Sequence, residues 1–302
     1  MSKKKSELVM VDGKVYHLGL SPEQITPNIF VVGDPARAHR VASRFEEINH
    51  QVQHREFITI TGRFQGHQMT VLGTGIGTDN VEIAIIEAYG LLAFDHNQVL
   101  KHNPPQMRII RIGTSGGIQA DIDAGTLAVT DYAIGLDSTA LYYDHQTTDD
   151  IERLESLCIN ILDQHIPEES RFKGRLPVYA SQSHSSVHDA LLTAAAGLKA
   201  VSGITVTAPG FYGPSGRHIP GLINTLPQIK SLLATLSYRD LRIVNMEMES
   251  SLIYHLGEKL GIKCGTICPI ISNPASHQSI PDYQILIDQA IDTALRAMVG
   301  LL

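Results

Sequence analysis

Residues 107–117 have the sequence MRIIRIGTSGG, a run of buried-strand type that leads directly into a glycine-rich turn. A glycine turn at the carboxyl end of a strand exposes backbone N–H groups, and ligands bind at this edge of open α/β sheets. Arg111 stands three residues before Thr114, so a fixed cation and a hydroxyl meet at one place. This combination suits an anion, most simply phosphate. The alternative is a tight turn in which the glycines only permit close packing and Arg111 pairs with a structural carboxylate.

Two similar junctions precede this one in the chain. Residues 28–32 (NIFVV) end in Gly33, before a helix that carries Arg37, and residues 69–72 run into the glycine-rich stretch 73–77. Strands and helices alternate from there to a terminal helix over 282–301. We therefore predict one α/β domain, residues 1–302, with a central mixed β-sheet flanked by helices.

Three segments near these junctions are expected to shape the site. Residues 131–150 are expected to form an irregular surface region, and residues 208–220, rich in Gly and Pro, a loop. A strand over 242–245 is expected to lead into a helix over 247–260. Residues 73–77 lack the sixth-position glycine of the dinucleotide fingerprint, and Thr78 stands there instead. No organic cofactor is expected.

The composition narrows the functional classes. With 302 residues, 43% hydrophobic content and a net charge of −7, the chain has no concentrated basic face for nucleic acid. It has no apolar run long enough to span a bilayer, so we expect a cytoplasmic protein without a membrane partner. The three cysteines form no C-x-x-C pair, and no H-E-x-x-H spacing appears, so no metal site is predicted.

Three arginines stand beside strand ends or glycine turns: Arg37, Arg55 and Arg111. The planar guanidinium group binds phosphate oxygens through two hydrogen bonds, so converging arginines would hold a dianion without a metal. Taken singly, each arginine is more typical of a surface ion pair. The set of three favours the anion site.

The segment 245–250 (NMEMES) places two carboxylates near the start of the helix expected over 247–260. Glu247 or Glu249 could cap that helix, where the macrodipole favours an anion. Equally, a glutamate that accepts two hydroxyl hydrogen bonds would grip a ribose diol, with the neighbouring methionines as an apolar floor. In the loop, Phe211 and Arg217 could stack on a planar ring and bond its carbonyl edge, or Phe211 could simply anchor the loop.

Taken together, these segments resemble the nucleoside phosphorylase family, and within it the uridine phosphorylase branch. They occur in the family's order, between about residues 17 and 275. The matching segments are 17–20 (HLGL), 33–37 (GDPAR), 54–57 (HREF), 74–77 (TGIG), 111–116 (RIGTSG), 211–217 (FYGPSGR) and 247–250 (EMES).

The resemblance implies reversible phosphorolysis of a nucleoside, with inorganic phosphate as co-substrate. It implies phosphate binding by Gly33, Arg37, Arg111 and Thr114, with Arg55 from a neighbouring subunit. It implies ribose binding by Thr114, Met248 and Glu249, with His17 from the partner chain, and a base site of Phe211, Ser215, Arg217 and Glu247. Arg111, Glu249 and Arg217 would be the catalytic residues. A homo-oligomer, dimer or hexamer, is implied, with a monovalent cation near Glu56 at a subunit contact.

The sequence departs from the family at the base site. The uridine branch has glutamine where this chain has Ser215, and a serine is too short to make both hydrogen bonds to the uracil edge. Purine enzymes have aspartate where this chain has Ser272, and Pro274 replaces the arginine usual in the uridine branch. Uridine is the expected substrate. The alternatives are a purine nucleoside phosphorylase, a nucleosidase that uses water, and a non-catalytic nucleoside-binding relative.

Overall fold

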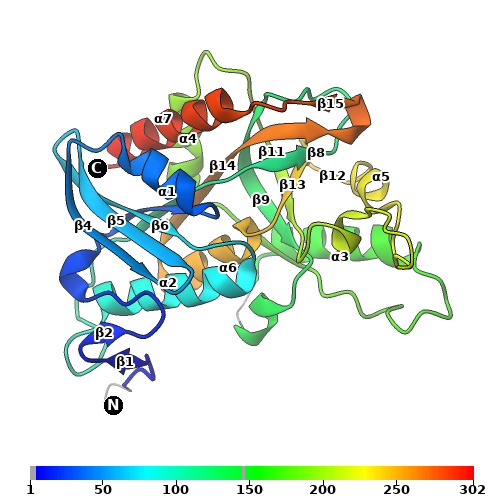
Figure 1. Cartoon of the computed structure of the whole chain (residues 1–302). Helices are drawn as coiled ribbons and strands as arrows, with labels where there is room; N and C mark the ends of the chain where they lie inside the picture. Colours follow the sequence, from blue (N-terminus) through cyan, green and yellow to red (C-terminus); the bar gives the residue numbers. More distant parts are fainter. Residues whose placement is uncertain (1–4, 145–146) are drawn as a thin grey trace.

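The computed structural model describes residues 5–144 and 147–302, and most of its strands join one sheet (Figure 1). In sheet order the strands are β10 (Tyr179–Gln182), β9 (Leu127–Gly135), β11 (Ala200–Thr207), β13 (Leu241–Glu247), β8 (Ser115–Gly117), β14 (Lys263–Asn273), β7 (Arg108–Ile112), β3 (Asn28–Val32), β6 (His67–Gly73), β5 (Phe57–Phe64) and β4 (Glu47–His54). Short β12 (Ser237–Tyr238) and β15 (Gln278–Ser279) extend it, and β1 (Met10–Val11) pairs with β2 (Lys14–Val15) separately.

The sheet is mixed, as the sequence predicts. Strand β3 runs parallel to both β6 and β7, and β7 runs parallel to β14, whereas β4, β5 and β6 are antiparallel neighbours. Strand β9 pairs with β11 and also, antiparallel, with β14. These pairings close β9, β11, β13, β8 and β14 into a ring at the centre of the sheet. The α/β fold class is confirmed.

Helices cover both faces of the sheet. They are α1 (Pro35–Ala42), α2 (Thr78–Ala93), α3 (Asp149–Asp163), α4 (Ser185–Ala194), α5 (Ile229–Leu233), α6 (Ser250–Leu260) and α7 (Gln284–Gly300). Figure 1 shows α1, α4 and α7 on one side and α2 and α6 on the other. Successive strand residues point to opposite faces, so Ile109 of β7 packs in the core under α2 and α6 while Ile110 packs under α1 and α7. Strands buried on both faces are mostly apolar, and the two arginines of β7 are exceptions to that pattern.

Three expectations about local structure were wrong. Residues 131–135 continue β9 rather than opening an irregular region, because the register shift at β11 accommodates the polar Asp131 within a buried strand. Residues 115–117 are strand β8, and Gly117 is needed there because a Cβ would lie 2.6 Å from the Asn273 side chain. The helix expected from residue 247 begins at Ser250, since Glu247 still pairs within β13.

The sequence also gives no signal for β4, whose residues EINHQVQH are mostly exposed at the sheet edge. Among the described residues, no helix is both long enough and apolar enough to cross a bilayer.

Candidate active site

A cavity of about 730 Å³ opens where the ends of β3, β7 and β13 approach the loop after β11. Its wall includes most of the residues that the sequence assigns to the site: Gly33, Arg37, Arg111, Thr114, Phe211, Ser215, Arg217, Glu247, Met248, Glu249 and Ser272. Segments separated by more than two hundred residues therefore meet in one place. The carboxyl ends of parallel strands are the expected position for a ligand site in such a sheet.

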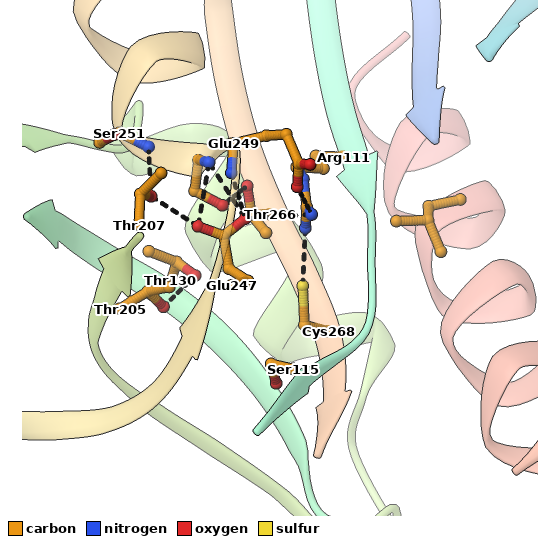
Figure 2. Close-up of polar contacts among 12 residues, drawn as sticks. Arg111, Ser115, Thr130, Thr205, Thr207, Glu247, Glu249, Ser251, Thr266 and Cys268 are labelled. Atoms are coloured by element: carbon orange, nitrogen blue, oxygen red, sulfur yellow. Dashed lines mark hydrogen bonds and ion pairs between the residues drawn. The ribbon is translucent and has the colours of Figure 1, made fainter. Parts of the chain in front are cut away.

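Arg111 is the central charge of this cavity. It is 4% exposed, its Nη2 lies 3.1 Å from Glu247 Oε2 and pairs more closely with Glu249, and its Nη1 lies 2.9 Å from Cys268 Sγ (Figure 2). Burial lowers the pKa of Arg111, but the two carboxylates outweigh burial and raise it well above its usual value. Arg111 therefore has the structural carboxylates of the alternative interpretation and also lines the cavity, and its binding of an anion stays a prediction.

Gly113 makes room for this arrangement. A Cβ at residue 113 would overlap the Arg111 guanidinium group and would lie 2.7 Å from Cys268 Sγ. Burial raises the pKa of the Cys268 thiol to about 11, so the group beside Arg111 is a neutral thiol. The glycine after β7 therefore lets the arginine fold back across its own strand end.

Arg37 brings a second guanidinium group to the same region. The Asp34 carboxylate caps α1 by accepting from Ala36 N at 2.9 Å, and this fixes the first turn that carries Arg37. Arg37 Nη1 donates to the Ile112 carbonyl oxygen at 3.1 Å. Burial and the charge of Arg111 both lower the pKa of Arg37. Two neighbouring cations of this kind form a site for an anion.

Glu249 and Glu247 have different surroundings. The Glu249 carboxylate accepts the Gly77 N–H at 2.8 Å as well as pairing with Arg111, so it joins the glycine loop before α2 to the anion region. The Glu247 carboxylate accepts from the backbone N–H groups of Glu249 and Ser250, at 3.0 and 3.1 Å, and from the Thr207 hydroxyl (Figure 2). The Glu247 carboxylate thus caps the start of α6 and pairs with Arg111, while Glu247 lines the same cavity as the base loop. Its assignment to the base site stays a prediction.

The loop after β11 forms the far end of the cavity. The Arg217 guanidinium lies 4.0 Å from the centroid of the Phe211 ring, and its Nε donates to the Phe211 carbonyl oxygen at 2.9 Å. The Ser215 hydroxyl donates to the Gly210 carbonyl oxygen at 3.2 Å and is buried. An aromatic face and a cation are therefore present together, as predicted, while Pro274 lies outside the cavity wall.

Two predicted residues lie away from this cavity. His17 Nδ1 contacts Glu87 Oε1 at 2.8 Å, and Arg55 Nη2 donates to the Tyr16 hydroxyl at 2.8 Å with its guanidinium over the Tyr16 ring. Arg55 and Tyr16 line a second hollow with His54, whose Nδ1 contacts the His17 carbonyl oxygen at 2.9 Å. The fold brings these residues to one another on an exposed surface, and not to the chain's own cavity.

Cavity residues that the sequence did not indicate are Lys230, on the five-residue helix α5, and Tyr283, before α7. Neither follows a glycine junction, so no local pattern marks them. Over the described part of the chain, no three His, Cys, Asp or Glu side chains are grouped as ligands of a metal ion.

A family model described as the phosphorylase superfamily matches residues 27–300 of this chain. The chain belongs to the phosphorylase superfamily. This phosphorylase is 28% identical over 271 residues to the uridine phosphorylase of Thermococcus kodakarensis, covering 88% of this chain and 80% of that one. It is 25% identical over 289 residues to the uridine phosphorylase of Haemophilus influenzae, covering 94% and 96%.

Comparison with solved structures indicates the same family. A Trypanosoma brucei nucleoside phosphorylase, described as showing uridine phosphorylase activity, superposes on this phosphorylase with a TM-score of 0.86 at 26% identity, covering 99% of this chain and all of that one. The predicted nucleoside phosphorylase family, with its similarity to the uridine phosphorylases, is confirmed, and so is the pentosyltransferase class.

Proposed function

We propose that this phosphorylase catalyses reversible phosphorolysis of uridine, giving uracil and ribose 1-phosphate. The observation that carries the proposal is the pair of buried guanidinium groups, Arg37 and Arg111, next to Glu249 in one cavity. The names of its relatives support the choice of uridine. Inorganic phosphate is the co-substrate, and the proposed setting is nucleoside salvage in the cytoplasm.

In the proposed reaction, phosphate binds Arg37, Arg111, Thr114 and the backbone of Gly33. The ribose lies over Met248, and Glu249 accepts hydrogen bonds from its hydroxyl groups. The bond from C1′ to the base breaks and its electron pair leaves with the base, while a phosphate oxygen forms the new bond to C1′. Phosphate stabilises the positive ribosyl centre, and the departing uracil anion then takes a proton.

Arg217 is proposed to stabilise the negative charge that develops on the uracil carbonyl oxygens. Its guanidinium already lies on Phe211, so the ring and the cation form one preorganised surface. Preorganised charge is effective because it needs no rearrangement as the bond breaks. The serine at residue 215 adds no second donor, since its hydroxyl is used by the Gly210 carbonyl oxygen.

We further propose a homo-oligomer, dimer or hexamer, in which Arg55 and His17 complete the active site of a partner subunit. The support is that neither residue lines the cavity of its own chain, and that exposed Arg55 and half-buried His17 each contact the Tyr16–His54 surface. A twofold contact would exchange these residues in both directions. Glu56, exposed in the same turn, is the proposed position of a monovalent cation at that contact.

Product analysis of the purified protein tests the reaction. We expect uridine to be consumed only with inorganic phosphate, with uracil and ribose 1-phosphate formed in equal amounts. Equal consumption without phosphate, with free ribose as product, would show hydrolysis instead. A panel of uridine, thymidine, inosine and adenosine tests the base, and preference for inosine would replace uridine phosphorolysis by the purine alternative.

A further inference from the structure

Lys230 lies in the cavity wall beside the base loop. Helix α5, which carries it, is held against that loop at Gly216, whose φ is +71°. A Cβ at residue 216 would lie 2.7 Å from the Pro227 carbonyl oxygen and 3.0 Å from Ile229 Cγ2. This close approach of the two backbones fixes Lys230 beside Arg217.

The loop is joined to the segment before α5 by a second contact. Asn224 Nδ2 donates to the Arg217 carbonyl oxygen at 2.8 Å. Arg217 is itself held on Phe211 by its stacked guanidinium and its Nε hydrogen bond. The aromatic face and the two cations therefore belong to one wall of the cavity. Figure 1 shows that α5 lies far from α1 in the molecule.

The two cations of this wall are alike in charge, and the described residues provide no carboxylate to pair with them. Burial, and then the charge of Arg217, lower the pKa of Lys230. Within the described residues, no carboxylate lies within ion-pair distance of Lys230 or Arg217, whereas Arg111 has two. Like charges held together in a partly buried wall are unfavourable until an anion arrives. Arg37 and Arg111 show the same relation at the phosphate end.

We infer that Lys230 is a second cation of the base site, which together with Arg217 binds the carbonyl oxygens of an oxo-base and stabilises their charge as the base leaves. This inference rests on the proposed phosphorolysis. Uracil offers two carbonyl acceptors, so an ammonium and a guanidinium group together can donate hydrogen bonds to both. An amino group, as in cytosine or adenine, is a donor and would face the ammonium group unfavourably. The substrate class is therefore nucleosides of oxo-bases.

Steady-state phosphorolysis by three lysine variants tests the inference. Lys230→Met keeps the side-chain length and removes the charge, Lys230→Arg keeps a charge, and Lys259→Met removes an exposed lysine far from the loop on α6. We expect Lys230→Met to lower kcat for uridine by about 10- to 100-fold, within or below the range for loss of one oxyanion donor. Lys230→Arg should recover most of the rate, and Lys259→Met should match the wild type.

A better leaving group separates charge stabilisation from structural damage. The fluorine of 5-fluorouridine stabilises the base anion, so the defect of Lys230→Met should be clearly smaller with this substrate than with uridine. The preference for uridine over cytidine should also decrease. Equal defects with both substrates, or wild-type kinetics for Lys230→Met, would overturn the assignment of Lys230.

The two proposals fail in different ways. Wild-type protein that consumes no nucleoside in the presence of phosphate would reject the proposed function and this inference with it. Uracil binding, measured by calorimetry without phosphate, gives a readout independent of turnover, and we expect it to be about tenfold weaker in Lys230→Met than in Lys259→Met. Equal uracil affinity in an active enzyme would reject Lys230 alone.

Discussion

Replacing Arg111 by methionine tests the buried charge cluster at the centre of the cavity. The methionine keeps much of the apolar volume but removes the cation between Glu247 and Glu249, each about 4% exposed. Removing one partner of a buried ion pair costs about 3–5 kcal/mol, because the remaining charge stays desolvated. A domain is stable by only about 5–15 kcal/mol, so we expect Arg111→Met to lose a large part of its stability.

The same variant should lose phosphate binding. Without the Arg111 cation we expect kcat/KM for phosphate to fall by about 10²–10³-fold, as for other losses of a buried charge donor. Adding Glu249→Gln removes one of the two orphaned carboxylates, so the double variant should regain part of the stability and none of the activity. Arg242→Met is the matched control, because Arg242 forms a solvent-exposed pair with Asp121 at 2.6 Å, and exposed pairs contribute little to stability.

Urea unfolding at neutral pH measures the effect. We expect the unfolding midpoint of Arg111→Met to lie well below that of the wild type, and the midpoint of Arg242→Met to match it. Equal unfolding midpoints for Arg111→Met and Arg242→Met would refute the assignment of a buried charge cluster around Arg111.

Three further outcomes are expected. Gly113→Ala places a Cβ on the guanidinium of Arg111, so KM for phosphate should rise about 10-fold or more while nucleoside binding changes little; unchanged phosphate kinetics would contradict this. Co-expressed Glu249→Gln and Arg55→Met subunits, each inactive alone, should regain activity because one of the two sites in each mixed dimer is intact, about a quarter of all sites when the subunits pair at random; no recovery would mean that sites are not shared. The proposed role needs the charged ammonium form of Lys230, whose pKa is lowered. The kcat of the wild type should therefore fall as the pH rises through this pKa, whereas Lys230→Arg should keep its rate at the same alkaline pH.

The grouping of the two arginines and their glycine turns in one cavity could be predicted from sequence, because its parts are local patterns. A buried strand followed by a glycine identifies the junctions at Gly33 and Gly113, and an arginine lies near each. The carboxylates of the segment 245–250 are likewise adjacent in the chain. The sequence does not specify which partner each charged group has. From sequence alone, Glu247 could cap the helix or bind a ligand, and the structure shows its carboxylate accepting the N–H of Ser250 at the start of α6.

The other parts of the site depend on contacts between remote segments. Cys268 contacts Arg111 across 157 positions of sequence, and its strand gives no sign of that contact. Lys230 reaches the cavity only because Gly216 permits the loop to approach α5 closely. A lysine on a five-residue helix is otherwise typical of a solvated surface. Long-range packing, rather than any local pattern, makes these residues part of the site.

The charged side chains proposed to act on phosphate and ribose are different from those proposed to recognise the base. Arg111 and Glu249 form one ion pair, so the proposed phosphate and ribose sites share these two side chains, and loss of Arg111 would leave two buried carboxylates without their cation. At the base end, Lys230 and Arg217 have no carboxylate partner among the described residues, and Ser215 is turned to the backbone. Substitution there leaves the ion pair intact, which is why this structure constrains the reaction class more strongly than the identity of the base.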